Sequence, residues 1–72
     1  KASVPVTAIL GNSAIDVSDF AALQVGDIIR LDRKVDDELD IFVGNIKKFT
    51  ALPGATGKEY AVRITTVIRE EQ

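Results

Sequence analysis

The sequence predicts a mostly β fold: a small, barrel-like sheet of about six strands with one short helix. Apolar residues make up 46% of the chain, yet Met and Trp are absent, so most of them are Val, Ile, Leu and Ala. These residue types favour strands that are buried on at least one face. Apolar and polar residues alternate along several segments, and Gly and Pro separate those segments. A length of 72 residues allows one domain, which we expect to span residues 1–72.

The chain opens with a strand signal. Every second residue from Val4 to Leu10 is apolar, so these side chains would share one face of a strand. Pro5 has no backbone N–H, and we expect it at a strand start or on a sheet edge. Gly11-Asn12 predicts a tight turn. The alternation over residues 13–17 then predicts a strand that pairs back as a hairpin.

A short helix is expected after this hairpin. Asp16 or Ser18 can cap its start. Phe20 and Leu23 lie three residues apart, so they would share its buried side. Gly26 is expected to end it, because a glycine adopts the left-handed backbone that commonly closes a helix.

The second half of the chain predicts four more strands, over residues 28–31, 39–43, 46–51 and 60–68. Gly44-Asn45, Pro53-Gly54 and Gly57-Lys58 supply the turn signals between the last three. The last strand has the clearest alternation, with one face formed by Tyr60, Val62, Ile64 and Ile68. Lys47 and Lys48 would point to opposite faces of their strand.

Two segments suggest chemistry, and we interpret both as structural. Residues 54–58 resemble the end of a phosphate-binding loop, but Leu52 and Glu59 stand where that motif needs a Gly and a Ser or Thr. Residues 36–40 are acidic, yet no Gly lies among them to bend a calcium-binding loop. We expect a loop and a solvated turn, respectively. No His is present to activate a serine, so no enzyme activity and no cofactor are expected.

A partner chain is the expected source of added stability. The core of so short a chain rarely supplies more than about 3–5 kcal/mol without a disulfide, a metal ion or an oligomer. Cys and His are both absent, which removes disulfides and the commonest metal ligands. Residues 28–31 and 60–68 carry apolar side chains on both faces, which implies a closed barrel or a second chain.

Two other classes of function remain possible from the sequence. A small barrel could bind nucleic acid through the basic and aromatic residues of segments 47–49 and 58–60, although a net charge of −2 opposes this. A β domain that folds as a monomer could serve as a structural spacer.

No apolar stretch approaches the roughly 20 residues of a membrane span, so no membrane insertion is expected. The first residue is not Met, so we expect a piece of a longer chain.

Residues 23–32 carry a family resemblance. Their sequence, Leu-Gln-Val-Gly-Asp-Ile-Ile-Arg-Leu-Asp, resembles the L-x-x-G-D-(V/I)-I-x-L-D core of SpoA (surface presentation of antigens) domains. These domains occur in flagellar motor switch proteins and in type III secretion sorting platforms. The resemblance covers almost the whole chain. Its tail, with Phe49, Pro53-Gly54, Gly57 and residues 61–64, is similar to the C-terminal domain of the FliM branch.

The resemblance implies a non-catalytic assembly module. Such domains form intertwined, saddle-shaped dimers with a second SpoA domain, here a FliN-type domain or a second copy. The pair would build the switch ring that controls rotation direction and docks export components. That ring lies in the bacterial cytoplasm, peripheral to the inner membrane at the flagellar basal body. A SpoA domain of a type III secretion sorting platform is the alternative.

Nine residues are expected to matter most for this role. We expect the core or interface to contain Leu23, Ile28, Leu31, Ile41, Val43, Val62 and Ile64. Special backbone geometry is expected at Gly26 and Gly54.

Overall fold

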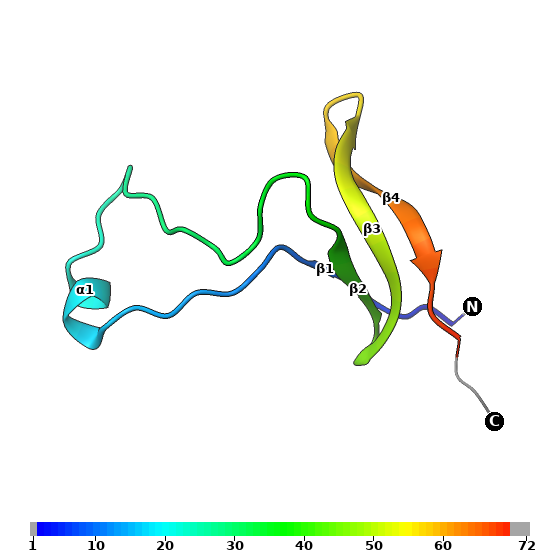
Figure 1. Ribbon diagram of the computed structural model, residues 1–72, viewed down its shortest axis with the longest axis horizontal. Coiled ribbons are helices and arrows are strands. Elements are labelled where there is room, and N and C mark those ends of the chain that lie inside the picture. Colours follow the sequence, from blue (N-terminus) through cyan, green and yellow to red (C-terminus); the bar gives the residue numbers. More distant parts are fainter. Residues whose placement is uncertain (1, 70–72) are drawn as a thin grey trace.

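The computed structural model describes residues 2–69 and is mostly β, as the sequence predicts (Figure 1). Its elements, in chain order, are β1 (Val6–Ile9), α1 (Val17–Ala21), β2 (Leu39–Val43), β3 (Ile46–Thr56) and β4 (Glu59–Val67). The four strands form one antiparallel sheet in the order β1-β2-β3-β4. Within the described part of the chain β1 and β4 do not pair with each other, so the sheet is open and is not a barrel.

Two tight turns connect the last three strands, as expected. Gly44-Asn45 joins β2 to β3, and Gly57-Lys58 joins β3 to β4. Gly44 and Gly57 have φ values of +62° and +60°, a left-handed conformation that only glycine adopts at little cost. Local turn chemistry therefore sets both connections.

Each of the two longer strand pairs contains a β-bulge. In the pairing of β2 with β3, Ile41 faces Phe49 and Phe42 faces Lys47, so Lys48 is the extra residue. In the pairing of β3 with β4, Thr50 faces Thr66 and Ala51 faces Ile64, so Thr65 is extra. A bulge bends its strand and increases the local twist. Figure 1 shows β3 and β4 as a strongly curved ribbon.

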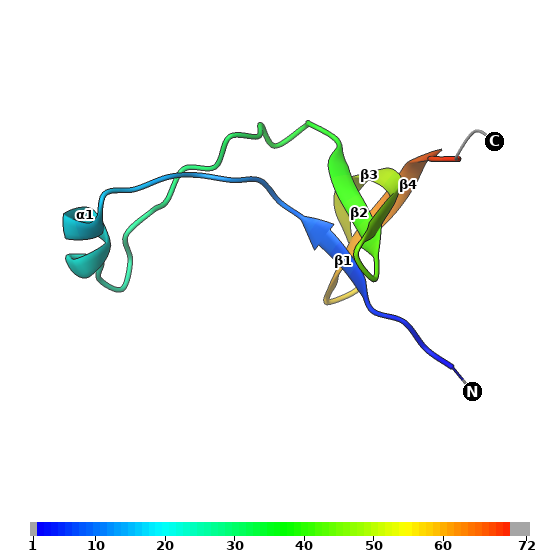
Figure 2. The same ribbon diagram turned by 90° about the horizontal axis from the view of Figure 1, so that it is seen from below.

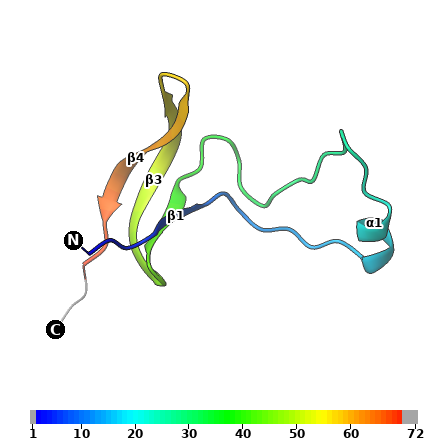
Figure 3. The ribbon, with the colours of Figure 1, turned by 180° about the vertical axis from the view of Figure 1, so that it is seen from behind.

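Residues 10–38 form a long arm that leaves the sheet, turns at its tip and returns (Figures 1 and 2). We call this segment the arm. Helix α1 lies at its far end, away from all four strands in the view from behind as well (Figure 3). The radius of gyration is 15.6 Å, whereas a compact domain of this length would have about 11 Å. The arm accounts for this extended shape.

The core is very small. Among residues 2–69 the buried apolar side chains are Leu39, Ile41 and Ala51, with exposed fractions of 4% or less. Leu39 and Ile41 come from β2, and Ala51 lies opposite Leu39 on β3. The centre of the sheet is therefore the best-packed part of the chain.

Several sequence expectations need correction. The structure has no strand over residues 13–17 or 28–31, so four strands replace the expected six in the described chain. Both segments lie in the arm, where no neighbouring strand completes a hydrogen-bonded ladder. The first strand pairs with β2 and not with residues 13–17.

Pro53-Gly54 does not end a strand, because β3 continues through both residues. The pairing of β2 with β3 stops at Leu39 and Ala51, so this part of β3 has only β4 beside it. A proline is tolerated on such an open edge, where its missing N–H breaks no ladder. The turn signal was overridden by pairing with β4.

Candidate interaction surface

One face of the sheet is almost entirely apolar. Residues that are directly opposite in an antiparallel pair share a face. The register aligns Val6 and Ala8 with Val43 and Ile41, and it aligns Ala51, Pro53 and Ala55 with Ile64, Val62 and Tyr60. Phe49 faces Val67, so the apolar row continues to the end of β4. We call this surface the apolar face.

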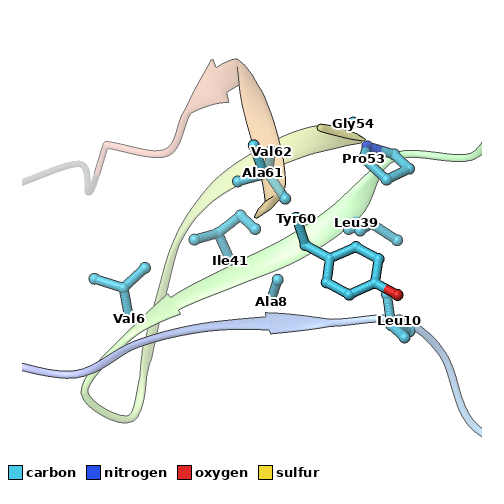
Figure 4. Close-up of a pocket in the computed structure, with 10 residues that line it drawn as sticks. All are labelled: Val6, Ala8, Leu10, Leu39, Ile41, Pro53, Gly54, Tyr60, Ala61 and Val62. Carbon is cyan, nitrogen blue, oxygen red and sulfur yellow. The ribbon is translucent and has the colours of Figure 1, made fainter. Parts of the chain in front are cut away.

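The apolar face is hollowed into a groove of about 750 Å³ (Figure 4). Its lining comes from all four strands and the residue after β1: Val6, Ala8, Leu10, Leu39, Ile41, Pro53, Gly54, Tyr60, Ala61 and Val62. In the close-up the ring of Tyr60 extends over the groove toward Leu10. Tyr60 is 100% exposed and Leu10 is 61% exposed, so the groove is open to solvent in the single chain.

The arm exposes a second set of apolar side chains. Its large exposed hydrophobic residues are Leu10, Ile15, Val17, Phe20, Leu23, Val25, Ile28, Ile29, Leu31 and Val35. Helix α1 has no buried residue in the described structure. Exposed apolar side chains that gather in one region often mark a site of interaction. The arm and the apolar face together form the candidate interaction surface.

Charged residues at the base of the arm form a small network. Asp40 on β2 accepts from Lys47 on β3 at 2.9 Å and from Arg33 of the arm at 3.2 Å. Arg33 also donates to the backbone carbonyl of Glu38 at 2.6 Å. The hydrogen bond from Lys47, with a smaller contribution from Arg33, holds the pKa of Asp40 below its ordinary value. The network links the returning end of the arm to two strands.

Glu38 is held by two threonine hydroxyls. Thr50 Oγ1 and Thr65 Oγ1 each lie 2.7 Å from Glu38 Oε1, and the two hydroxyls lie 2.9 Å apart. Thr65 is the bulge residue of β4, so the bulge brings its side chain to this cluster. Hydrogen bonds from Thr50 and then Thr65 lower the pKa of the Glu38 carboxyl.

The structure divides the residues predicted from the sequence into two groups. On the sheet, Ile41 is buried, Val43 is half-buried, and Val62 and Ile64 are exposed. All four belong to the apolar face. In the arm, Leu23, Ile28 and Leu31 are exposed, and the arm itself extends away from the sheet (Figure 1).

The two glycines singled out by the sequence differ in conformation. Gly26 lies in the arm with φ +100°, in the region that favours glycine. Gly54 lies within β3 and is not among the glycines with positive φ.

Sequence reasoning missed part of this surface. Ala51 is fully buried, and Tyr60 and Val6 line the groove, yet none was among the expected interface residues. The alternation that places Val6 and Tyr60 on one face of their strands was available in the sequence. Burial of Ala51 had no such signal, because it depends on being opposite Leu39 and Ile64.

A search of residues 2–69 finds no group of three or more carboxylate, His or Cys side chains placed to hold a metal ion. Over the same residues, no helix is long and apolar enough to cross a membrane.

The amino-acid sequence is similar to a family model and to known proteins. A family model described as "Type III flagellar switch regulator (C-ring) FliN C-term" matches residues 1–69. The flagellar motor switch protein FliM of Bacillus subtilis (strain 168) is 41% identical over 63 residues, which are 88% of this chain and 19% of that protein. FliM of Treponema pallidum (strain Nichols) is 45% identical over 60 residues, 82% of this chain and 17% of that protein.

FliM of Thermotoga maritima is 37% identical over 65 residues, 90% of this chain and 20% of that protein. The chain thus spans about a fifth of the length of each of these relatives. The family is a structural component of the flagellar switch and not an enzyme family. The mostly β sheet, the SpoA-type core sequence and the match over residues 1–69 lead to one conclusion: this chain belongs to the family of FliM/FliN C-terminal (SpoA-type) domains of the flagellar motor switch.

Proposed function

We propose that this domain is an assembly module of the flagellar switch ring and works by pairing with a FliN-type SpoA domain. One observation carries the proposal: the described chain buries three apolar side chains and leaves the rest of an apolar sheet face half-buried or exposed. Burial of apolar area stabilises by roughly 25 cal/mol per Å². A second chain that covers this face supplies the burial that the single chain lacks.

The exposed arm supports an intertwined form of pairing. It carries ten large exposed hydrophobic residues and has no strand of its own within the described chain. Segments 13–17 and 28–31 have the alternation or β-branched composition of strands. In the proposed pair, each arm packs on the other chain, where these segments can complete a hydrogen-bonded ladder. The result is an intertwined dimer with shared strands.

The partner is proposed from family membership. Within the ring, a FliN-type domain offers a second SpoA surface, and a second copy of this chain is the substitute when no such domain is present. Docking of export components and control of rotation direction belong to the assembled ring. The proposed location is therefore the cytoplasmic side of the flagellar basal body.

The test is a mass measurement by light scattering across a dilution series, with and without a FliN-type domain. We expect a one-to-one complex with the FliN-type domain, and a homodimer that dissociates on dilution when that domain is absent. A chain that stays monomeric under both conditions, and still melts in one cooperative transition, would overturn the proposal. The control is the same chain mixed with a β domain of unrelated sequence, which should leave the mass unchanged.

A further inference from the structure

The geometry points to a latch at the base of the arm that holds the arm away from the sheet of its own chain. This inference rests on the proposed function, since it concerns how the arm becomes available to a partner. The arm exposes apolar residues, and its own sheet exposes an apolar face. Without a restraint, the arm could pack on that face within one chain and remove both surfaces from pairing.

The first part of the latch joins the two legs of the arm. The Asp32 N–H donates to the Asn12 carbonyl at 2.9 Å, and the Asn12 N–H donates to Asp32 Oδ1 at 2.8 Å. These residues are 20 positions apart, so the two hydrogen bonds close the arm into a loop at its base. One of them uses a charged acceptor, which strengthens it.

Gly11 allows this closure. A Cβ at Gly11 would lie 3.0 Å from Asp32 Oδ1, 3.1 Å from Arg33 Cγ and 3.2 Å from Leu31 Cβ. These are the atoms of the opposite leg, and the Gly11 φ of +153° is itself one that other residues rarely adopt. The absent side chain is therefore what lets the legs approach.

The second part of the latch fixes the joined legs to the sheet. Arg33 follows Asp32 directly and bonds Asp40 on β2, which in turn bonds Lys47 on β3. The Arg33 and Asp40 side chains are 29% and 24% exposed, so solvent screens this pair only in part. A change in the direction of the arm at its base, where residues 11–12 meet residues 32–33, would have to break this ion pair or the Asn12–Asp32 hydrogen bonds.

The latch raises affinity by keeping the arm ready to bind. When only a fraction of chains is competent to pair, the apparent dissociation constant rises by the inverse of that fraction. Asp32→Ala removes the side-chain acceptor, whereas Asp32→Asn keeps an Oδ1 acceptor at the same place. We expect Asp32→Ala to raise the dissociation constant of the pair about tenfold, and Asp32→Asn to recover most of that loss.

The experiment measures affinity together with the position of the arm. The chain has no Cys, so spin labels can be placed at Gln24→Cys, an exposed polar position in the arm, and at Lys58→Cys in the turn after β3. With the labelled chain diluted into an excess of unlabelled chain, pulsed electron paramagnetic resonance gives the distribution of distances between the two labels of one protomer. We expect one distance population in the otherwise wild-type chain and a second, shorter one in Asp32→Ala. Asp36→Ala, whose residue lies outside the latch, is the matched control.

An Asp32→Ala dissociation constant equal to that of the control would overturn the latch, whatever the distances show. If Asp32→Ala does not fold, Arg33→Gln removes the sheet side of the latch and is judged by the same criterion. If the wild-type chain never pairs, the proposed function fails separately. The latch is then tested on the single chain, where an unchanged distance distribution in Asp32→Ala overturns it.

Discussion

Glu38 is the residue whose protonation should matter most for the sheet. Its ionised carboxylate accepts hydrogen bonds from Thr50 and Thr65, which bridge β3 and β4, and its pKa is lowered in the folded chain. A carboxyl whose pKa falls on folding adds stability above its unfolded pKa and loses that contribution as pH falls through the folded value. Asp40 has a lowered pKa as well, so it acts in the same direction.

We therefore expect the melting temperature, at fixed protein concentration, to fall as pH is lowered from about 5 to about 3, around the ordinary carboxyl range near 4. Glu38→Gln should melt lower at pH 7 and show a weaker dependence over that range. Asp36→Asn, which removes an exposed carboxyl outside both clusters, serves as the control. A Glu38→Gln profile parallel to wild type would rule out this role.

At the scale of elements, the turn after β3 and the strand before it contain glycines with different roles. Gly57 has φ +60°, a conformation that costs a non-glycine residue roughly 1–2 kcal/mol. Gly54 has no positive φ, and a Cβ there would meet nothing within 4 Å. We expect Gly57→Ala to lower the free energy of unfolding by about 1 kcal/mol in urea titrations. Gly54→Ala should leave it unchanged or raise it, because Gly weakens a strand interior. Equal losses at both positions would contradict this assignment.

The sequence predicted elements well where the signal was local. Residues 39–43 and 60–67, and the turns at Gly44 and Gly57, follow from alternation and turn chemistry. Residues 28–31 have strand composition, but a strand also needs a ladder partner, and the described chain provides none there. The alternation of apolar and polar residues does not predict the two bulges either. Strict alternation from Tyr60 placed Ile68 on the apolar face, whereas the extra residue Thr65 places Val67 there, opposite Phe49.

At the scale of the whole molecule, the shape explains why the site was only partly predictable. Ile41, Val43, Val62 and Ile64 come together because pairing within one chain collects them. The arm residues stay apart from them, because no segment of the described chain pairs with the arm as a strand; in the proposed pair their neighbours belong to another chain. The extended arm accounts for the chain's radius of gyration of 15.6 Å, and alternation along a segment does not predict how far that segment extends from the sheet.

Tyr60 offers a test of pairing that leaves the single chain intact. It is fully exposed in this chain and extends over the groove, so its removal costs the isolated sheet little (Figure 4). Aromatic side chains at the centre of an interface often contribute 2 kcal/mol or more. We expect Tyr60→Ser to raise the dissociation constant with a FliN-type domain at least tenfold in isothermal titration calorimetry. Lys58→Ser, in the neighbouring turn, should leave that constant near the wild-type value, and equal effects would remove Tyr60 from the interface.

The bulges at Lys48 and Thr65 also determine where the chain can change length. Each is an additional residue opposite a regular strand, so deleting it restores simple pairing and leaves every other side chain on its present face. Loss of a regularly paired residue such as Thr50 would instead turn Phe49 toward the polar side, since a slip of one residue exchanges the two faces. Among related domains, single-residue gaps in these two strands should therefore collect at Lys48 and Thr65.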